Sequence, residues 1–260
     1  MSDQSDWRDH AFEGVLNFRD FGGYGCASRA LPRGRLYRSG HMARASDADL
    51  DGLHGLKLAV IVDLRSDEER ADQPSRRHAD FAGRVIEAPG AQHEGAPHRS
   101  GGGIDAEAVR ARMLDAYRDL PFRPALLDAY ARTFEALANG EGPILIHCAA
   151  GKDRTGLLAA LIQHVAGVSD TDIMADYLLT NRVQHPPERR DRFARWMTEA
   201  YGAAPSNDAV DVALGVEPAF LEMAWAAMRE RHGSVDGYLE KALGLSSERR
   251  AAVERSLLAD

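Results

Sequence analysis

The residues best suited to chemistry lie in one stretch, from His147 to Gly156, which reads HCAAGKDRTG. A cysteine thiolate is a nucleophile, and the planar guanidinium of an arginine can hold two oxygens of a phosphoryl group at once. Five residues separate Cys148 from Arg154, so the chain between them can encircle one tetrahedral oxyanion. Gly151 permits the backbone turn that such a loop requires. The pattern indicates a thiol set in a binding site for a phosphoryl group.

The flanking residues predict how this stretch is held. Apolar residues 143–146 precede it and apolar residues 157–162 follow it, which favours a buried strand and then a buried helix. Cys148 then lies where the strand ends, and Arg154 and Thr155 lie where the helix begins. Unpaired N–H groups and the helix dipole make that position electropositive and suited to an anion. Such a field can bring the pKa of a cysteine from about 8.5 to below about 7.

These residues resemble the signature loop of the cysteine-dependent tyrosine and dual-specificity phosphatases. The fuller form HCxxGKDRTG is similar to one bacterial branch, which acts on phosphotyrosine and often on phosphoinositides. The strings NFRDFGGY (17–24), LYRS (36–39), DLRS (63–66) and GSVDGYLEKALGLS (233–246) also resemble that branch, so the resemblance touches nearly the whole chain. It implies an α/β fold with a central, mainly parallel sheet flanked by helices.

The chemistry of the loop assigns a role to each of its members. We expect Cys148 to be the nucleophile and to form a thiophosphoryl intermediate. Arg154 and the backbone N–H groups of residues 149–154 should hold the phosphoryl oxygens. Thr155 can donate a hydrogen bond to the thiolate, and His147 is interpreted as a brace for the loop. The expected substrate-binding residues are Ala149, Ala150, Gly151, Lys152 and Thr155.

The general acid is harder to assign from the sequence. In most relatives an aspartate lies in the loop that here spans residues 90–103, and this loop contains none. Asp153 is the first candidate because it lies beside Arg154 in the signature. Asp63 is the second, because it ends the apolar strand predicted at 58–62, although an ion pair with Arg65 is an equal interpretation. Glu94 or His93 would be next.

Composition limits the remaining classes. The 260 residues carry a net charge of −8, which argues against a nucleic-acid partner. Two cysteines, Cys26 and Cys148, exclude a disulfide framework and suit a reducing cytoplasm. No signal peptide or membrane span is visible, so a cytoplasmic location is expected, while export without a visible signal stays open. No cofactor and no metal ion are expected, since arginine and backbone amides supply the positive charge.

We expect one phosphatase domain over 1–260, with a helical lid within 90–140 and a helical part from 169 to 260. Ser66 and Glu69 match a capping box for a short helix, and residues 203–215 are predicted to be a loop. The expected partner is a phosphorylated protein or a phosphoinositide. If Lys152 faces the ligand, it would favour multiply phosphorylated substrates such as phosphoinositides. The oligomeric state is left open.

Three other classes of protein were weighed against a phosphatase. A nucleotide-binding P-loop is rejected because Asp153 follows Lys152 where that motif needs Ser or Thr. A rhodanese-like sulfurtransferase and a non-catalytic phosphate-binding module remain the alternatives.

Overall fold

A five-stranded sheet forms the centre of the computed structural model, which describes residues 12–26, 29–88, 90, 104–183 and 187–258. In spatial order the strands are β1 (Arg19–Asp20), β4 (Leu36–Ser39), β7 (Ile144–His147), β5 (Val60–Asp63) and β6 (Arg84–Glu87). Strand β1 runs antiparallel to β4, and every other neighbouring pair is parallel. A separate hairpin pairs β2 (Gly25–Cys26) with β3 (Arg29–Ala30). The expected α/β fold with a mainly parallel sheet is confirmed.

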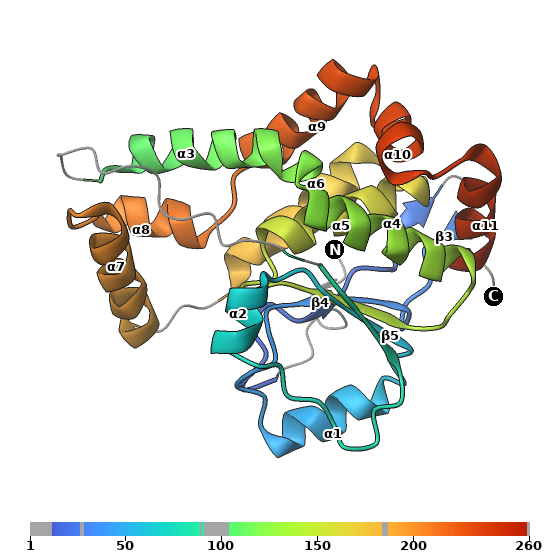
Figure 1. The fold of residues 1–260 in the computed structure, drawn as a ribbon, viewed down its shortest axis with the longest axis horizontal. Coiled ribbons are helices and arrows are strands. Elements are labelled where there is room, and N and C mark those ends of the chain that lie inside the picture. Colours follow the sequence, from blue (N-terminus) through green and yellow to red (C-terminus); the bar gives the residue numbers. More distant parts are fainter. Residues whose placement is uncertain (1–11, 27–28, 89, 91–103, 184–186, 259–260) are drawn as a thin grey trace, which may run out of the picture.

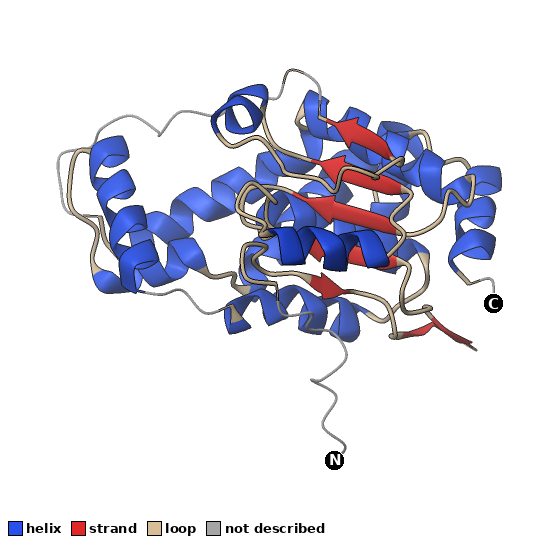
Figure 2. Ribbon diagram, turned by 90° about the horizontal axis from the view of Figure 1, so that it is seen from below, coloured by secondary structure: helices blue, strands red, loops and turns tan. Residues whose placement is uncertain are grey.

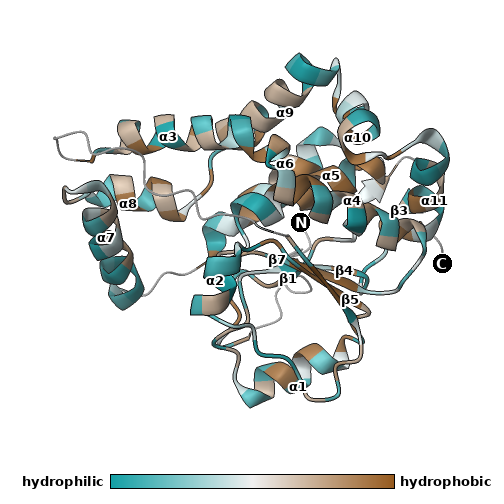
Figure 3. Ribbon diagram, in the orientation of Figure 1, coloured by the Kyte–Doolittle hydropathy of each residue, from teal (hydrophilic) through white to brown (hydrophobic). Residues whose placement is uncertain are grey.

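Side chains alternate between the two faces of this sheet and fill two cores. Val60 and Val62 join the larger core, beneath the layer that contains α4 (Pro124–Ala138) and α5 (Asp153–Val165). Ile61 points the other way, into a smaller core that α1 (Asp47–Gly55) covers. Figures 1 and 2 show the sheet between these layers, and Figure 3 shows its strands as hydrophobic.

The remaining helices extend the larger layer and reach beyond the sheet. They are α2 (Asp67–Asp72), α3 (Ala106–Asp119), α6 (Asp170–Leu178), α7 (Pro187–Tyr201), α8 (Asn207–Leu214), α9 (Pro218–His232), α10 (Val235–Leu243) and α11 (Ser247–Leu257), with short 3-10 turns at Leu120–Phe122 and Leu179–Arg182. Helix α3 packs against α8 and α9. In Figure 1 the ends of α3, α7 and α8 project to the left of the sheet. Among the described residues, no helix is long and apolar enough to cross a membrane.

The prediction of a loop over 203–215 is wrong, because α8 occupies Asn207–Leu214. The hydroxyl of Ser206 accepts a hydrogen bond from the backbone N–H of Ala209 and caps the helix. Proline and glycine at either end of this segment favoured a loop, but the short apolar helix buries Ala209 and Val210 against its neighbours. Tertiary packing therefore outweighs local propensity here.

A buried ion pair lies at the end of strand β5. The two carboxylate oxygens of Asp63 accept hydrogen bonds from Nε of Arg65 at 2.9 Å and from Nη2 at 2.7 Å. Both residues are buried. Burial raises the pKa of Asp63, but His147 and Arg65 outweigh that effect and lower the pKa to about 2. The pair therefore stabilises the fold only while the carboxyl is ionised.

We expect Asp63→Asn to lower the free energy of unfolding by about 3–5 kcal/mol at neutral pH, because a buried guanidinium loses its charged partner. The pKa of Asp63 is depressed on folding, so this stabilisation is complete above about pH 4 and is lost as the pH falls toward about 2. Urea unfolding of both proteins over this range measures the difference, which should shrink in acid.

Asp67→Asn is the matched control, because Asp67 pairs with Arg70 at the surface with its side chain 67% exposed. We expect this control to change stability by less than about 1 kcal/mol. An equal loss of unfolding free energy in both variants would show that the buried ion pair contributes no more to stability than the exposed one.

Candidate active site

The signature loop lies at the edge of the sheet where the parallel strands end. Cys148 follows β7 directly, beside the segments that leave β4 and β5. Gly151 adopts a positive φ of 68°, and a Cβ on it would lie only 2.3 Å from the carbonyl oxygen of Ser39. The loop therefore presses against the end of β4, and only glycine fits at that point.

Three successive carbonyl groups of the loop accept hydrogen bonds from outside it. The backbone N–H of His41 donates to Ala149 O at 3.2 Å. The side-chain amide of Asn17 donates to Ala150 O at 3.2 Å and to Gly151 O at 2.8 Å. Arg38 Nη2 also donates to Gly151 O at 3.1 Å.

The capture of these carbonyls fixes where the amides of the loop point. In a trans peptide the C=O of one residue and the N–H of the next point in opposite directions. Carbonyls held from outside at residues 149–151 therefore turn the N–H groups of residues 150–152 toward the inside of the loop. The unpaired N–H groups of the first turn of α5 follow them. The result is a nest of donors suited to an oxyanion.

Contacts with buried charged residues hold Asn17 and Arg38 in position. Arg38 Nη1 donates to Asp176 Oδ2 at 2.8 Å, and both side chains are at most 1% exposed. Arg19 donates to the backbone carbonyl of Asp176 at 3.0 Å and to the side-chain oxygen of Asn17. This last bond fixes the orientation of the Asn17 amide, so its NH₂ group faces the loop. Asn17 has a φ of 56°, a conformation that asparagine tolerates better than most residues.

Arg154 is oriented by a carboxylate from α2. Glu69 accepts from Nη1 at 2.6 Å and from Nη2 at 2.7 Å, and Leu64 O accepts from Nη1 at 3.1 Å. Burial opposes the charge of Arg154, but Glu69 outweighs it and raises the pKa of the guanidinium. A guanidinium has five N–H donors, so Nε and one hydrogen of Nη2 remain as a second two-pronged edge for a ligand.

Glu69 also fixes the start of the helix that carries it. Its carboxylate accepts from the backbone N–H of Ser66 at 2.7 Å, and its own N–H donates to the hydroxyl of Ser66 at 3.1 Å. The predicted capping box is confirmed. The same side chain therefore holds both α2 and Arg154.

Cys148 and Thr155 are both buried, one at the start of the loop and one in the first turn of α5. Cys148 is a free thiol with 2% of its surface exposed. The hydroxyl oxygen of Thr155 is buried and has no hydrogen-bond partner among the described residues. A buried hydroxyl is normally paired, so Thr155 has a donor to offer.

Asp153 faces two tyrosines and a lysine. Tyr117 donates to Asp153 Oδ1 at 2.8 Å, and the hydroxyls of Tyr117 and Tyr177 are 2.7 Å apart. Lys152 Nζ lies 3.6 Å from Asp153 Oδ1 and donates to the carbonyl of Ala213, in the last turn of α8, at 2.6 Å. Lys152 is thus buried and tied to α8 rather than solvated.

Asp63 and His147 lie inside the sheet edge rather than in the open pocket. Besides its two bonds to Arg65, Asp63 has an oxygen 3.6 Å from His147 Nε2. Burial lowers the pKa of His147 even though Asp63 opposes that shift. His147 Nδ1 lies 3.5 Å from the carbonyl of Cys148.

A cavity of about 610 Å³ opens over the loop. Ala149, Ala150, Lys152 and Asp153 form part of its lining, and α3, α7 and α8 form another wall. Its cationic lining side chains are Arg44, Arg65, Arg112, Lys152, Arg189 and Arg192, against the carboxylates Glu69, Asp72 and Asp153. Among the described residues, cations therefore outnumber carboxylates around this cavity, although the whole chain is acidic.

Sequence reasoning did not assign functional roles to Asn17, Arg38, Glu69 and Asp176. Asn17, Arg38 and Glu69 lie in or beside strings already singled out, NFRDFGGY, LYRS and the capping box, so a signal for them existed. Asp176 lies on an ordinary-looking helix and carried none. The third candidates for the general acid, His93 and Glu94, lie outside the described residues.

The chain is similar to known proteins over most of its length. A model of the tyrosine phosphatase family matches residues 10–259. The chain is 37% identical over 239 residues to a protein of Cupriavidus necator named as a tyrosine-protein phosphatase, an alignment that covers 90% of this chain and 84% of that protein. It is 32% identical over 259 residues to the triple specificity protein phosphatase PtpB of Mycobacterium tuberculosis, covering 88% of this chain and 92% of PtpB. The chain belongs to the tyrosine phosphatase family and is a phosphoric monoester hydrolase.

Proposed function

We propose that the chain hydrolyses phosphotyrosine monoesters through a covalent intermediate on Cys148. The thiolate sulfur attacks phosphorus, and the bond from phosphorus to the phenolic oxygen breaks. Water then attacks the thiophosphoryl group, which releases phosphate and restores the thiolate. The observation that carries this proposal is the capture of three loop carbonyls from outside, since it turns the amides toward the place where the phosphoryl group would lie.

Arg154 and the loop amides are proposed to stabilise the transition state. Charge in phosphoryl transfer is spread over three equatorial oxygens, and fixed donors aimed at them act without reorganisation. The Nε–Nη2 edge of Arg154 supports this role, because Glu69 occupies the adjacent Nη1–Nη2 edge. The buried, unpaired hydroxyl of Thr155 is suited to donate to the Cys148 thiolate when it leaves in the second step.

Asp153 is our choice for the general acid, with Asp63 second. Asp153 lines the cavity, so its carboxyl can reach the leaving oxygen of a bound ester. Asp63 has 0% of its surface exposed and engages both oxygens with Arg65. A carboxyl held in this way would have to break a buried ion pair before it could serve substrate.

The finer substrate class follows from the charge of the cavity. The excess of arginine over carboxylate in its lining favours substrates with more than one phosphate, because each added anionic group finds a cation. We therefore propose phosphoinositides as further substrates beside phosphotyrosine. Phosphoserine and phosphothreonine, which carry one phosphate each, are included in the proposal only on the breadth of a relative. The relative PtpB is named a triple specificity phosphatase, which supports a broad range.

The domain organisation and location complete the proposal. We propose one phosphatase domain, and α3, from the expected lid region within 90–140, supplies Val109, Arg112 and Met113 to the cavity wall. A reducing cytoplasm suits the free thiol of Cys148. Family membership disfavours the sulfurtransferase alternative, and the simultaneous presence of Cys148, Arg154 and Thr155 disfavours a non-catalytic module.

We expect Cys148→Ser to abolish turnover of phosphotyrosine, because a serine hydroxyl is far less ionised than a cysteine thiol at neutral pH. Phosphate release from a phosphotyrosine peptide in the presence of a metal chelator measures this directly, and vanadate should inhibit the wild-type chain. Cys26→Ser is the matched control, since Cys26 is also a buried free thiol but lies outside the loop. Wild-type turnover by the Cys148→Ser protein would remove Cys148 as nucleophile.

The acid assignment predicts a dependence on the leaving group. Asp153→Asn should slow hydrolysis of phosphotyrosine much more than that of a nitrophenyl ester, because a strongly acidic leaving group needs no proton. The variant should also lose the basic arm of the pH–rate profile, which reports the acid, and keep the acidic arm.

Asp170→Asn controls for effects on the helix, because Asp170 begins α6 as Asp153 begins α5. If Asp63→Asn instead shows the dependence on the leaving group while Asp153→Asn does not, the two roles are reversed.

A further inference from the structure

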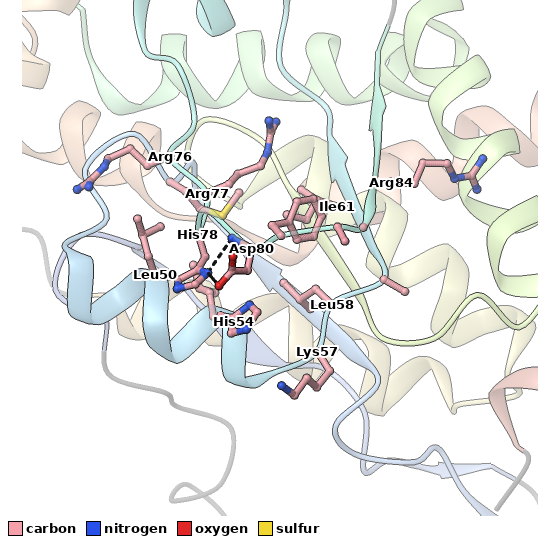
Figure 4. Close-up of a pocket in the computed structure, with 16 residues that line it drawn as sticks. Leu50, His54, Lys57, Leu58, Ile61, Arg76, Arg77, His78, Asp80 and Arg84 are labelled. Carbon is pink, nitrogen blue, oxygen red and sulfur yellow. Dashed lines mark hydrogen bonds and ion pairs between the residues drawn. The ribbon is translucent and has the colours of Figure 1, made fainter.

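A second cluster of chemically active side chains lies on the opposite face of the sheet from α5. His54 is in the last turn of α1, and His78 and Asp80 lie in the segment between α2 and β6. They line a cavity of about 440 Å³ whose floor is apolar. Figure 4 shows the three side chains grouped together at the side of this cavity. Nothing in the proposed phosphatase reaction uses them.

The side chains of the cluster lie close to one another. The rings of His54 and His78 stack with centroids 4.2 Å apart and an interplanar angle of 22°. One ligand atom from each of His54, His78 and Asp80 can be chosen so that all three lie within 4.8 Å of one another. Asp51 adds a fourth group, with its Oδ1 3.4 Å from His78 Nε2.

We propose that His54, His78 and Asp80 bind one divalent transition-metal ion of the zinc class, with Asp51 or water completing the coordination. Neutral imidazole and carboxylate are the nitrogen and oxygen ligands that such ions take. Zinc–ligand bonds of about 2.0–2.2 Å in a tetrahedral site put the donor atoms roughly 3.3–3.6 Å from one another. The cluster is close enough to reach that spacing by side-chain rotation, because Asp80 is 80% and His78 25% exposed.

The charges around the cluster do not oppose a cation as strongly as their number suggests. Two of the nearby arginines are paired with carboxylates: Arg76 with Asp47 at 2.6 Å and Arg84 with Glu141 at 2.8 Å. Lys57 and Arg77 also line the cavity, and the carboxylates of Asp51 and Asp80 offset them. A metal ion would then add charge to a nearly balanced region.

Binding would add a link between α1 and the segment that carries His78 and Asp80, beside the existing pairs of Arg76 with Asp47 and of His78 with Asp51. His54 is fixed on α1, whereas His78 and Asp80 belong to a segment without helix or strand. One internal contact already orders this segment, since the backbone N–H of Asp80 donates to His78 Nδ1 at 3.1 Å. A metal ion with ligands from both sides would therefore link the segment to α1, and its binding would stabilise the folded chain.

Zinc titration by calorimetry tests the proposal in the Cys148→Ser chain, from which any affinity tag has been removed, because the active-site thiolate could itself bind zinc. We expect saturable binding of a single ion and a rise in Tm on adding zinc. Magnesium should not bind, because it prefers oxygen ligands.

His54→Gln and His78→Asn, each in the same background, should weaken zinc binding by at least about tenfold and abolish the rise in Tm. Circular dichroism of the metal-free variants establishes that each is folded. His164→Gln is the matched control, since His164 also lies beside a carboxylate, 3.0 Å from Asp236, but outside the cluster. Absence of saturable binding in the parent, binding unchanged in both histidine variants, or an equal loss in the control would overturn the proposal. None of these outcomes depends on phosphatase activity.

Discussion

The capture of the Gly151 carbonyl by Asn17 and Arg38 is the interaction on which the rest of the site depends. Hydrogen bonds to charged donors contribute roughly 1.5–3 kcal/mol, and neutral ones about 1 kcal/mol. Together these hydrogen bonds decide whether the backbone N–H groups of the loop face its inside or its outside. The donors come from residues more than a hundred positions away in the chain. Without these hydrogen bonds, the backbone amides of the loop would not be held facing inward.

This arrangement requires a buried charge, and the fold supplies the partner. Arg38 is fully buried, and a buried guanidinium without a carboxylate destabilises a protein strongly. Asp176 on α6 neutralises it and also contacts Arg19. The orientation of the loop is therefore tied to the position of α6, which packs beside α5. Glu69, on α2, pairs with Arg154. Two carboxylates outside the signature, Asp176 and Glu69, therefore help to hold the loop and Arg154 in place.

These ion pairs, together with that of Asp63 and Arg65, also shape the electrostatics of the cavity. Asp176 and Asp63 lie behind the loop with their charges matched, and Glu69 occupies one edge of Arg154. The cations that line the cavity, such as Arg189 and Arg192 on α7, face fewer carboxylates. An acidic protein thus offers a positive cavity to an anionic substrate, a local field that net charge alone does not reveal.

The sequence predicted the parts of the site that are contiguous in the chain. The pattern HCAAGKDRTG placed a strand, a loop and a helix correctly, and the parallel sheet followed from the apolar runs that flank it. It could not predict the partners of the loop carbonyls, because backbone groups leave no mark in a sequence. Asn17 was visible only as part of a turn-like string. The prediction for 203–215 failed because the packing of α8 against α3 is a tertiary effect.

The most direct test of the account is the oxyanion affinity of variants at Asn17. Vanadate binding is measured as protection of Cys148 from alkylation, with folding checked by circular dichroism. Asn17→Gly suits the backbone, because glycine readily adopts a φ of 56°. The variant removes both hydrogen bonds from the Asn17 side chain to the loop, so we expect an affinity for vanadate about tenfold lower. Asn17→Asp should be weaker still, because a carboxylate would face the carbonyls. Lys57→Gly, at the other described non-glycine residue with positive φ, should bind as the wild type does. Wild-type vanadate affinity in both folded Asn17 variants would contradict the claim that the captured carbonyls orient the loop.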